Sequence, residues 1–187
     1  MPIPAFDHNL VLPAHVGDPT KRADLSPYPC TTYELCERFA TSPQRQEILK
    51  GLLRFREELR QRGLVNGFQW MDGSFLEDVE TKLGRGPNDL DLVTIYWGYP
   101  LDFQNQLAGE FPAFADSQLS KDQYRLDHYP FDAGYSPAFT VENSQYWIQL
   151  FSHNRDQVWK GMLEIRLNTP DIDQQALDYL HSVNLGI

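Results

Sequence analysis

Two aspartates, one residue apart inside an apolar segment, are the side chains of this sequence that point most clearly to chemistry. In "NDLDLVTIYW", residues 88–97, Asp89 and Asp91 alternate with Leu90 and Leu92. Successive side chains of a β-strand point to opposite faces, so a strand here would place both carboxylates on one face. Two carboxylates that close repel each other unless a cation lies between them. The spacing therefore predicts a binding site for Mg²⁺ or, with the same oxygen ligands, Mn²⁺.

A turn of small residues precedes this segment. "DGSF", residues 72–75, lies between an expected strand and an expected short helix. Backbone N–H groups in such a turn, and at the start of the helix that follows, can donate hydrogen bonds to phosphate oxygens. Gly73 allows the backbone to approach a ligand closely, and Ser74 adds a hydroxyl group. Either feature alone is ordinary for a turn, but a phosphate-binding turn beside a metal-binding pair indicates a nucleotide site.

These residues resemble the motif of the polymerase-β-like nucleotidyltransferase superfamily, which includes minimal nucleotidyltransferases. That motif runs from an apolar residue through Gly, and then Gly or Ser, to a later Asp-apolar-Asp. Here it corresponds to residues 71–74 followed by residues 89–91. The sequence departs from the motif in two places. Asp72 occupies a position that is commonly apolar, and 14 residues, from Phe75 to Asn88, separate Ser74 from Asp89, which is more than the usual gap.

Further blocks extend this likeness over most of the chain. The sequence is similar to a bacterial nucleotidyltransferase-like protein family of unknown function. The blocks that carry the similarity are "LVLPAH", "CTTYELCERF", "RQEILKGLL", "DGSFLEDVE", "GRGPNDLDLVT" and "WKGML".

The superfamily resemblance implies a third carboxylate on a neighbouring strand. The segment "YRLDHYPFDAGY", residues 124–135, offers Asp127 in the middle of an expected strand and Asp132 at the start of a turn, where aspartate is common. Glu164 in "LEIRL" is a third candidate, although its position is typical of a strand residue that faces solvent. We favour Asp127.

The resemblance also implies roles and a reaction. Asp89, Asp91 and Asp127 would be the catalytic residues and would hold metal ions, while Gly73 and Ser74 would contact the triphosphate of an NTP such as ATP. The implied enzyme is a Mg²⁺-dependent nucleotidyltransferase that moves a nucleoside monophosphate to a hydroxyl of a protein, an RNA end or a small molecule. Small members of this superfamily often act in toxin-antitoxin or phage-defence systems, so a partner protein is also expected by resemblance.

Two other interpretations stay open. The chain could keep the fold but be catalytically silent, as a nucleotide-binding or protein-interaction module; the absence of a third carboxylate near the pair would favour this. It could also be a metal-dependent phosphohydrolase that uses the same acids, although it lacks the usual histidine ligands. The five histidines have no ligand-like spacing: His8, His15, His128, His153 and His181.

Other polar residues have ordinary explanations. Lys160 and Arg85 could approach the phosphates, but each is more typical of a solvated surface cation. Cys30 and Cys36 lie six apart without a CxxC spacing or a nearby histidine pair, which does not favour structural zinc. The cluster of Arg54, Arg56, Arg60 and Arg62 is interleaved with glutamates and indicates a solvated helix face.

Composition and charge limit the class of protein. The chain has 187 residues, 41% of them hydrophobic, and 16 basic against 26 acidic residues give a net charge of −10. This charge opposes non-specific binding to nucleic acid and mildly favours a protein or small-molecule acceptor. No membrane span is expected, and residues 1–15 lack the charged start and apolar core of a signal peptide, which predicts a cytoplasmic protein with reduced cysteines.

The elements that must position these residues predict one domain over residues 1–187. Six prolines within residues 1–29 predict an extended arm over residues 1–30. Capping signals predict helices that begin after Thr31, after Ser42 and after Thr169, the second of them ending before Gly63. Strands are expected in residues 64–73, 89–97, 123–131 and 158–167, the first two paired, with a broken helical region at 101–122 and a helix at 142–151. This pattern predicts an α+β fold with a nucleotidyltransferase-like small mixed β-sheet flanked by helices.

Overall fold

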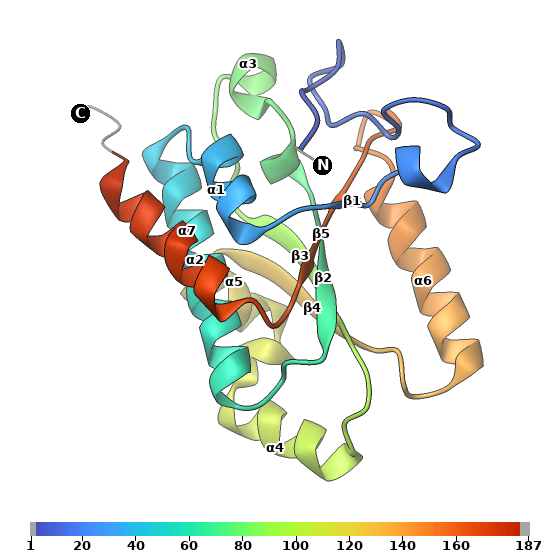
Figure 1. Cartoon of the computed structure of the whole chain (residues 1–187), viewed down its shortest axis with the longest axis vertical. Coiled ribbons are helices and arrows are strands. Elements are labelled where there is room, and N and C mark those ends of the chain that lie inside the picture. Colours follow the sequence, from blue (N-terminus) through green and yellow to red (C-terminus); the bar gives the residue numbers. More distant parts are fainter. Residues whose placement is uncertain (1–2, 184–187) are drawn as a thin grey trace.

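The computed structural model describes residues 3–183, which form a mixed five-stranded sheet flanked by helices (Figure 1). The spatial order of the strands is β1-β5-β2-β3-β4. β2 pairs antiparallel with both β3 and β5, whereas β1 is parallel to β5 and β4 is parallel to β3. The strands are β1 (Tyr28–Pro29), β2 (Gly67–Asp72), β3 (Leu90–Tyr96), β4 (Leu126–Asp132) and β5 (Leu163–Arg166). The expected α+β class with a small mixed sheet is confirmed, as is the pairing of β2 with β3.

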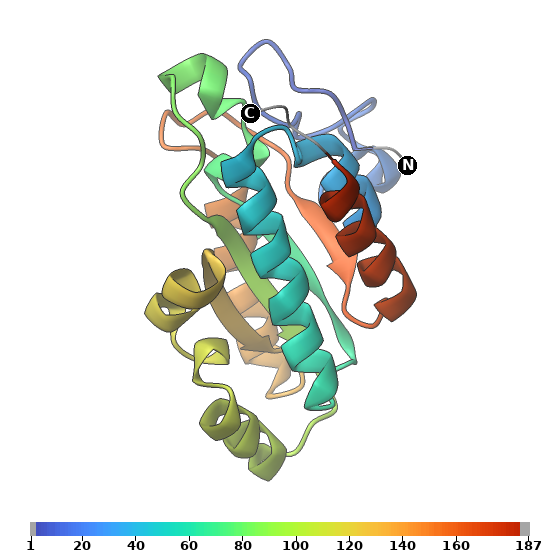
Figure 2. The ribbon, with the colours of Figure 1, turned by 90° about the vertical axis from the view of Figure 1, so that its left-hand side faces the viewer.

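Helices cover both faces of the sheet. The long helix α2 lies along one face with α1 and α7 beside it (Figure 2), and α6 lies on the opposite face (Figure 1). The α-helices are α1 (Thr32–Phe39), α2 (Pro43–Gln61), α3 (Val79–Leu83), α4 (Leu101–Glu110), α5 (Ser117–Tyr124), α6 (Pro137–Phe151) and α7 (Pro170–Ser182). Short 3₁₀ turns occupy η1 (Arg22–Asp24), η2 (Ser74–Leu76) and η3 (Pro112–Phe114). Among residues 3–183, no helix combines the length and the apolar character needed to cross a bilayer.

Local capping chemistry sets the starts of α1 and α2. The Glu34 N–H donates to Thr31 Oγ1 at 3.1 Å and the Thr31 N–H donates to Glu34 Oε2 at 2.8 Å, which completes a capping box. Ser42 caps α2 by accepting a hydrogen bond from the Arg45 N–H at 3.2 Å. Gly63, with φ of 83°, follows the end of α2. These predicted boundaries are confirmed.

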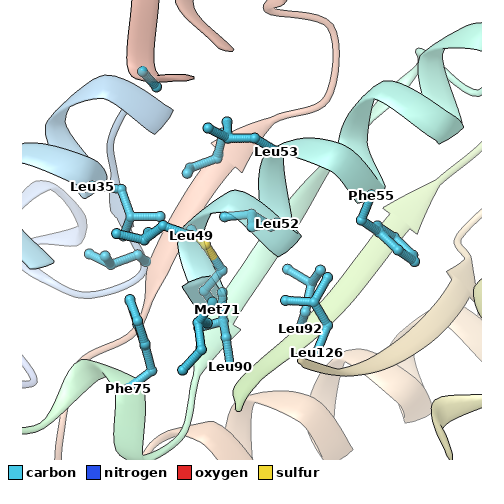
Figure 3. Close-up of a cluster of buried hydrophobic side chains, with 14 of the residues drawn as sticks. Leu35, Leu49, Leu52, Leu53, Phe55, Met71, Phe75, Leu90, Leu92 and Leu126 are labelled. Carbon is cyan, nitrogen blue, oxygen red and sulfur yellow. The ribbon is translucent and has the colours of Figure 1, made fainter. Parts of the chain in front are cut away.

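The pleat of the strands separates two apolar clusters. Leu90 and Leu92 of β3 point toward α2 and join the larger cluster, together with Met71 and Leu126 of the neighbouring strands (Figure 3). The opposite face is apolar along most of its length and packs against α6. Its cluster consists of Trp70, Val93, Ile95, Phe131, Trp147, Phe151 and Met162. The expected alternation at the start of β3 is confirmed, because Leu90 and Leu92 join the cluster on the α2 side whereas Val93 joins the cluster on the α6 side.

The proline-rich N-terminal segment forms part of the core. Tyr28 and Pro29 add a short edge strand beside β5, and Val11 bridges to Glu77 near the end of η2. Val11 and Leu12 are fully buried. The segment is extended as expected, with a single short 3₁₀ turn among residues 3–27, but it is packed into the domain rather than only laid over it.

Several predicted boundaries are wrong for identifiable reasons. α6 starts at Pro137, not at residue 142, because Ser136 caps it by accepting from the Phe139 N–H. β5 covers only residues 163–166 of the predicted 158–167, since the N–H groups of Lys160 and Gly161 donate to Ser152 and Leu12 outside the sheet.

Two further predictions are wrong for a shared reason: that Thr169 caps α7 with its side chain, and that Arg56 lies on a solvated helix face. Thr169 makes no side-chain capping bond; its Oγ1 accepts from Arg56 Nη2 at 2.8 Å. Arg56 is only 2% exposed and also donates to Asp173 and Gln69. A buried guanidinium needs such partners, so Arg56 ties α2 to α7 and to β2 instead of lying on a solvated face.

Candidate functional site

Aspartates from three adjacent strands meet at one end of the sheet. Asp72, the last residue of β2, is paired in register with Asp91 of β3, and Asp91 is paired in register with Asp127 of β4. Asp89 precedes β3 and lines the same cavity as the other three. All four lie on the α6 side of the sheet, because they share the alternation of Trp70 and Val93. The structure therefore brings together the predicted trio of Asp89, Asp91 and Asp127.

The central carboxylate of this group has an unfavourable environment. The Asp91 carboxylate accepts no hydrogen bond from the described residues. Burial is the largest cause that raises the pKa of Asp91 from 3.8 to about 6, and the charges of Asp89 and Asp127 are the next largest. The buried Oδ1 of Asp127 likewise has no hydrogen-bond partner within residues 3–183. Carboxylate oxygens left in this condition are suited to a cation.

One ammonium group already lies between two of the acids. Lys121 Nζ of α5 is 2.7 Å from Asp127 Oδ2 and 3.6 Å from Asp89 Oδ2. These contacts raise the pKa of Lys121, the Asp127 side-chain contact being the largest cause. Sequence reasoning missed this residue. Its position six residues before Asp127 gives no spacing signal, since the contact depends on α5 packing beside β4.

The turn that follows β2 holds its backbone against Asp91. Gly73 has φ of 83°, and a β-carbon built on it would stand 2.1 Å from Asp91 Oδ2. Only glycine fits both the conformation and the space. The helix that follows, η2, is just three residues long, so any phosphate contact here would come from the N–H groups of the turn and the Ser74 hydroxyl. Gly73 and Ser74 both line the cavity.

Lys160 is a buried residue that contacts this turn, and it is not the solvated surface cation that the sequence indicated. It is 2% exposed, and its Nζ lies 2.9 Å from Asp72 Oδ1 and 2.9 Å from Glu77 Oε1. It also donates to the Gly73 carbonyl at 3.2 Å. Burial raises the pKa of Asp72 to about 7, although the nearby ammonium opposes that shift. The unusual aspartate in the motif is thus explained by a buried ion cluster that sequence reasoning missed.

The alternative third acids lie elsewhere. Asp132, at the far end of β4, accepts from Gln104 Nε2 and from the Gly134 N–H, as its turn position suggests. Glu164 accepts a hydrogen bond from Trp70 Nε1 at 3.0 Å and does not line the cavity. His128 points to the α2 face, as its place next to Asp127 predicts, and bonds to Thr94 there. Of the three candidates, Asp127 is the one placed next to Asp91.

These acids line a cavity of about 690 Å³, a size suited to a small organic ligand. Its lining changes in character from one side to the other. The acids, Gly73, Ser74 and Lys160 lie at the end of the sheet, and exposed cations such as Arg85 come from the loops. The remaining side, formed by β4 and α6, is aromatic and apolar: Tyr129, Tyr146, Trp147, Leu150 and Phe151.

The donor set fits a magnesium ion that is completed by a ligand. Within the described range, no three acidic, histidine or cysteine side chains converge closely enough to hold a metal ion unaided. Mg²⁺ is usually held by one or two carboxylates together with waters and substrate phosphates, and does not need a full protein cage. Asp89 and Asp91 could supply those carboxylates, and the buried Oδ1 of Asp127, which has no hydrogen-bond partner among residues 3–183, could supply a further oxygen beside them.

Comparison with known proteins identifies a family but not an activity. No curated protein and no solved structure shows detectable similarity to the chain. A family model described as "Family of unknown function (DUF6932)" matches residues 4–166, which include the turn, all four aspartates, Lys121 and Lys160. The chain therefore belongs to the DUF6932 family.

Proposed function

We propose that this protein is a Mg²⁺-dependent nucleotidyltransferase that transfers a nucleoside monophosphate from an NTP to a hydroxyl group. One observation carries the proposal. Asp89, Asp91 and Asp127 lie together at one sheet end, where a glycine turn is held directly against Asp91. A carboxylate cluster beside a tight, small-residue turn suits a metal-bound polyphosphate.

The chain's own residues would bind and orient the reactants. Asp89 and Asp91 would hold the ion on the triphosphate, and Asp127 would hold a second ion or orient the acceptor hydroxyl. Backbone N–H groups at Gly73 and Ser74 would donate to the phosphate oxygens. When bound, Mg²⁺ supplies positive charge that stabilises the negative charge developing on the transferred phosphate and the leaving pyrophosphate. Such a reaction needs little beyond positioning and charge neutralisation.

The proposal extends to the fold and its setting. The arrangement of β2, the Gly73-Ser74 turn, β3 and β4 supports a nucleotidyltransferase-like fold. The acceptor could be a protein, an RNA end or a small molecule. The net charge of −10 favours a protein or a small molecule over bulk nucleic acid. A toxin-antitoxin or phage-defence role with a partner protein rests on the superfamily resemblance alone.

A catalytically silent nucleotide-binding module is the second candidate. The ion pair between Lys121 and Asp127 favours it, because an ammonium group already pairs with one oxygen of the carboxylate that a second ion would use. Such a protein would bind Mg²⁺-NTP at Asp89 and Asp91 without transferring the nucleotide.

Binding and transfer should be measured on the same samples. Mg²⁺ with each NTP is titrated calorimetrically into the wild type and Asp89→Ala/Asp91→Ala, and transfer of labelled NTP to protein, RNA and small-molecule pools is followed in parallel. Asp102→Ala/Asp122→Ala removes two exposed charges outside the cavity and serves as the control. The transferase is supported if wild type and control bind and label an acceptor while the site variant does neither. Binding without labelling supports the silent module, and no binding by the wild type overturns both.

A further inference from the structure

The aromatic side of the cavity has no role in holding metal or phosphate. It consists of Tyr129 on β4 and of Tyr146, Trp147 and Leu150 on α6, here called the aromatic wall. We propose that the aromatic wall binds the base of the nucleotide, with Tyr146 as the principal stacking residue. This inference rests on the proposed function, since it assumes that the phosphates lie at Gly73 and Ser74.

The sheet places the wall next to the acids. Tyr129 lies two residues after Asp127 on the same strand and therefore on the same face, about 7 Å farther along. The two residues line one continuous cavity with the phosphate turn. A ligand with its phosphates at Gly73 and its reacting centre near Asp127 would thus extend its remaining part toward α6.

The two tyrosines of the wall present aromatic surface that is not buried in the core. Tyr146 is 57% exposed and Tyr129 is 40% exposed, whereas Trp147 behind them is 6% exposed. The Tyr146 and Trp147 rings meet edge to face with centroids 4.9 Å apart, and the Tyr129 and Trp147 centroids are 5.2 Å apart. Trp147 thus supports both tyrosine rings, which remain open to the cavity. Exposed rings in a fixed arrangement suit a flat, apolar ligand surface.

The distribution of charge favours a nucleobase over another apolar group. The acidic end of the cavity suits metal-bound phosphates, and exposed Arg85 and Arg155 lie at its border. The wall itself carries hydroxyl groups but no charge. A ligand that is anionic at one end and flat and aromatic at the other matches both ends of the cavity. Stacking tolerates every base, so we expect binding of all four NTPs, with purines bound somewhat more tightly because their rings are larger.

The test compares a nucleotide with its phosphates alone. Binding of Mg²⁺-ATP and of Mg²⁺-tripolyphosphate is measured calorimetrically on the wild type, Tyr146→Ala and Tyr146→Phe. We expect Tyr146→Ala to weaken ATP binding about tenfold to a hundredfold, the range measured for loss of one stacking partner, and to leave tripolyphosphate binding unchanged. Tyr146→Phe keeps the ring and should bind ATP like the wild type. Tyr135→Ala is the matched control, because Tyr135 is 74% exposed near the start of α6 but does not line the cavity.

The outcomes separate this inference from the function on which it rests. If the wild type binds neither ligand, the proposed function fails. If it binds both ligands equally, or if Tyr146→Ala weakens both to the same extent, a phosphate site exists but the wall does not hold the base. If Tyr146→Ala changes neither affinity, the stacking role of Tyr146 is overturned. Circular dichroism melting of each variant identifies any loss of ATP binding that arises from unfolding.

Discussion

The backbone of Gly73 lies so close to Asp91 that a β-carbon on the glycine would stand 2.1 Å from Asp91 Oδ2. The turn and the central aspartate therefore pack directly against each other, although 17 residues separate them along the chain. Register explains this contact. β2 and β3 pair so that Asp72 stands opposite Asp91, and the chain turns immediately afterwards. Any group bound at the turn would be bound beside Asp91 as well.

Replacing Gly73 by alanine should therefore damage the site more than it damages the fold. The variant must move the turn or Asp91, and for the transferase proposed above we expect a displacement of this kind to lower the transfer rate on the order of a hundredfold. Gly84→Ala is the control. Gly84 also has a positive φ, 64°, but an added β-carbon there would meet nothing within 4 Å. Equal losses of labelled-nucleotide transfer in both variants would assign the effect to backbone strain alone.

Lys160 should be essential for stability because it is the buried counter-ion of Asp72 and Glu77. Lys160→Met leaves two buried carboxylates without their cation and should lower the free energy of unfolding by about 3–5 kcal/mol in urea titrations. Lys82→Met removes an exposed ion pair with Asp156 and should cost at most about 1 kcal/mol. Adding Asp72→Asn and Glu77→Gln to Lys160→Met removes the two unpaired charges and should restore much of the lost free energy of unfolding. A cost for Lys160→Met no larger than that for Lys82→Met would show that the cluster is not stabilising.

Lys121 should compete with divalent ions for Asp127 and Asp89. Removing the ammonium group in Lys121→Met leaves these carboxylates without their cation, so nucleotide-free protein should bind Mn²⁺ more tightly, on the order of tenfold. Electron paramagnetic resonance measures the free Mn²⁺ directly. Lys50→Met, which removes an exposed pair with Glu47 on α2, should bind Mn²⁺ like the wild type. Weaker Mn²⁺ binding by Lys121→Met would instead make Lys121 a support for the ion site.

Stability should depend on pH through Asp91. Burial and the charges of Asp89 and Asp127 raise its pKa from 3.8 in a model peptide to about 6, while Lys160 and Lys121 oppose the shift. The folded state thus binds this proton more tightly than the unfolded state does. The resulting stabilisation is fully present below about pH 4 and is lost as the pH rises through about 6.

Asp91→Asn keeps this side chain neutral at every pH and tests the prediction directly. In metal-free buffer above pH 6.5, the variant should be more stable than the wild type by on the order of 2 kcal/mol, and the difference should disappear toward pH 4. Denaturant titrations at several pH values measure it. The same variant should lose Mg²⁺-NTP binding. An Asp91→Asn protein that is less stable than the wild type at pH 7 would contradict the assigned environment of Asp91.

Local signals account for the parts of the fold that the sequence predicts well. The capping residues Thr31 and Ser42 act on N–H groups within three residues, so they fix the starts of α1 and α2 without help from the rest of the chain. The alternation of Asp89–Leu92 is likewise local, and it places both acids on one face of β3 or its immediate extension. The start of α6 was predicted wrongly although its cap, Ser136, is local. The α7 cap and the extent of β5 were predicted wrongly because they depend on distant partners. Thr169 bonds to Arg56, and Gly161 bonds to Leu12.

The sequence by itself thus determined the types and local spacing of the acids and of the small-residue turn, together with most of the elements that carry them. Only the tertiary structure decided their neighbours. Strand order brings Asp127 next to Asp91, the packing of α5 brings Lys121 between two acids, and the return of the chain before β5 buries Lys160 under the turn. Apart from the pair of Lys121 and Asp127, which are six positions apart, these contacts join residues tens of positions apart. Their geometry depends on how the sheet and helices assemble, which no local pattern of residues encodes.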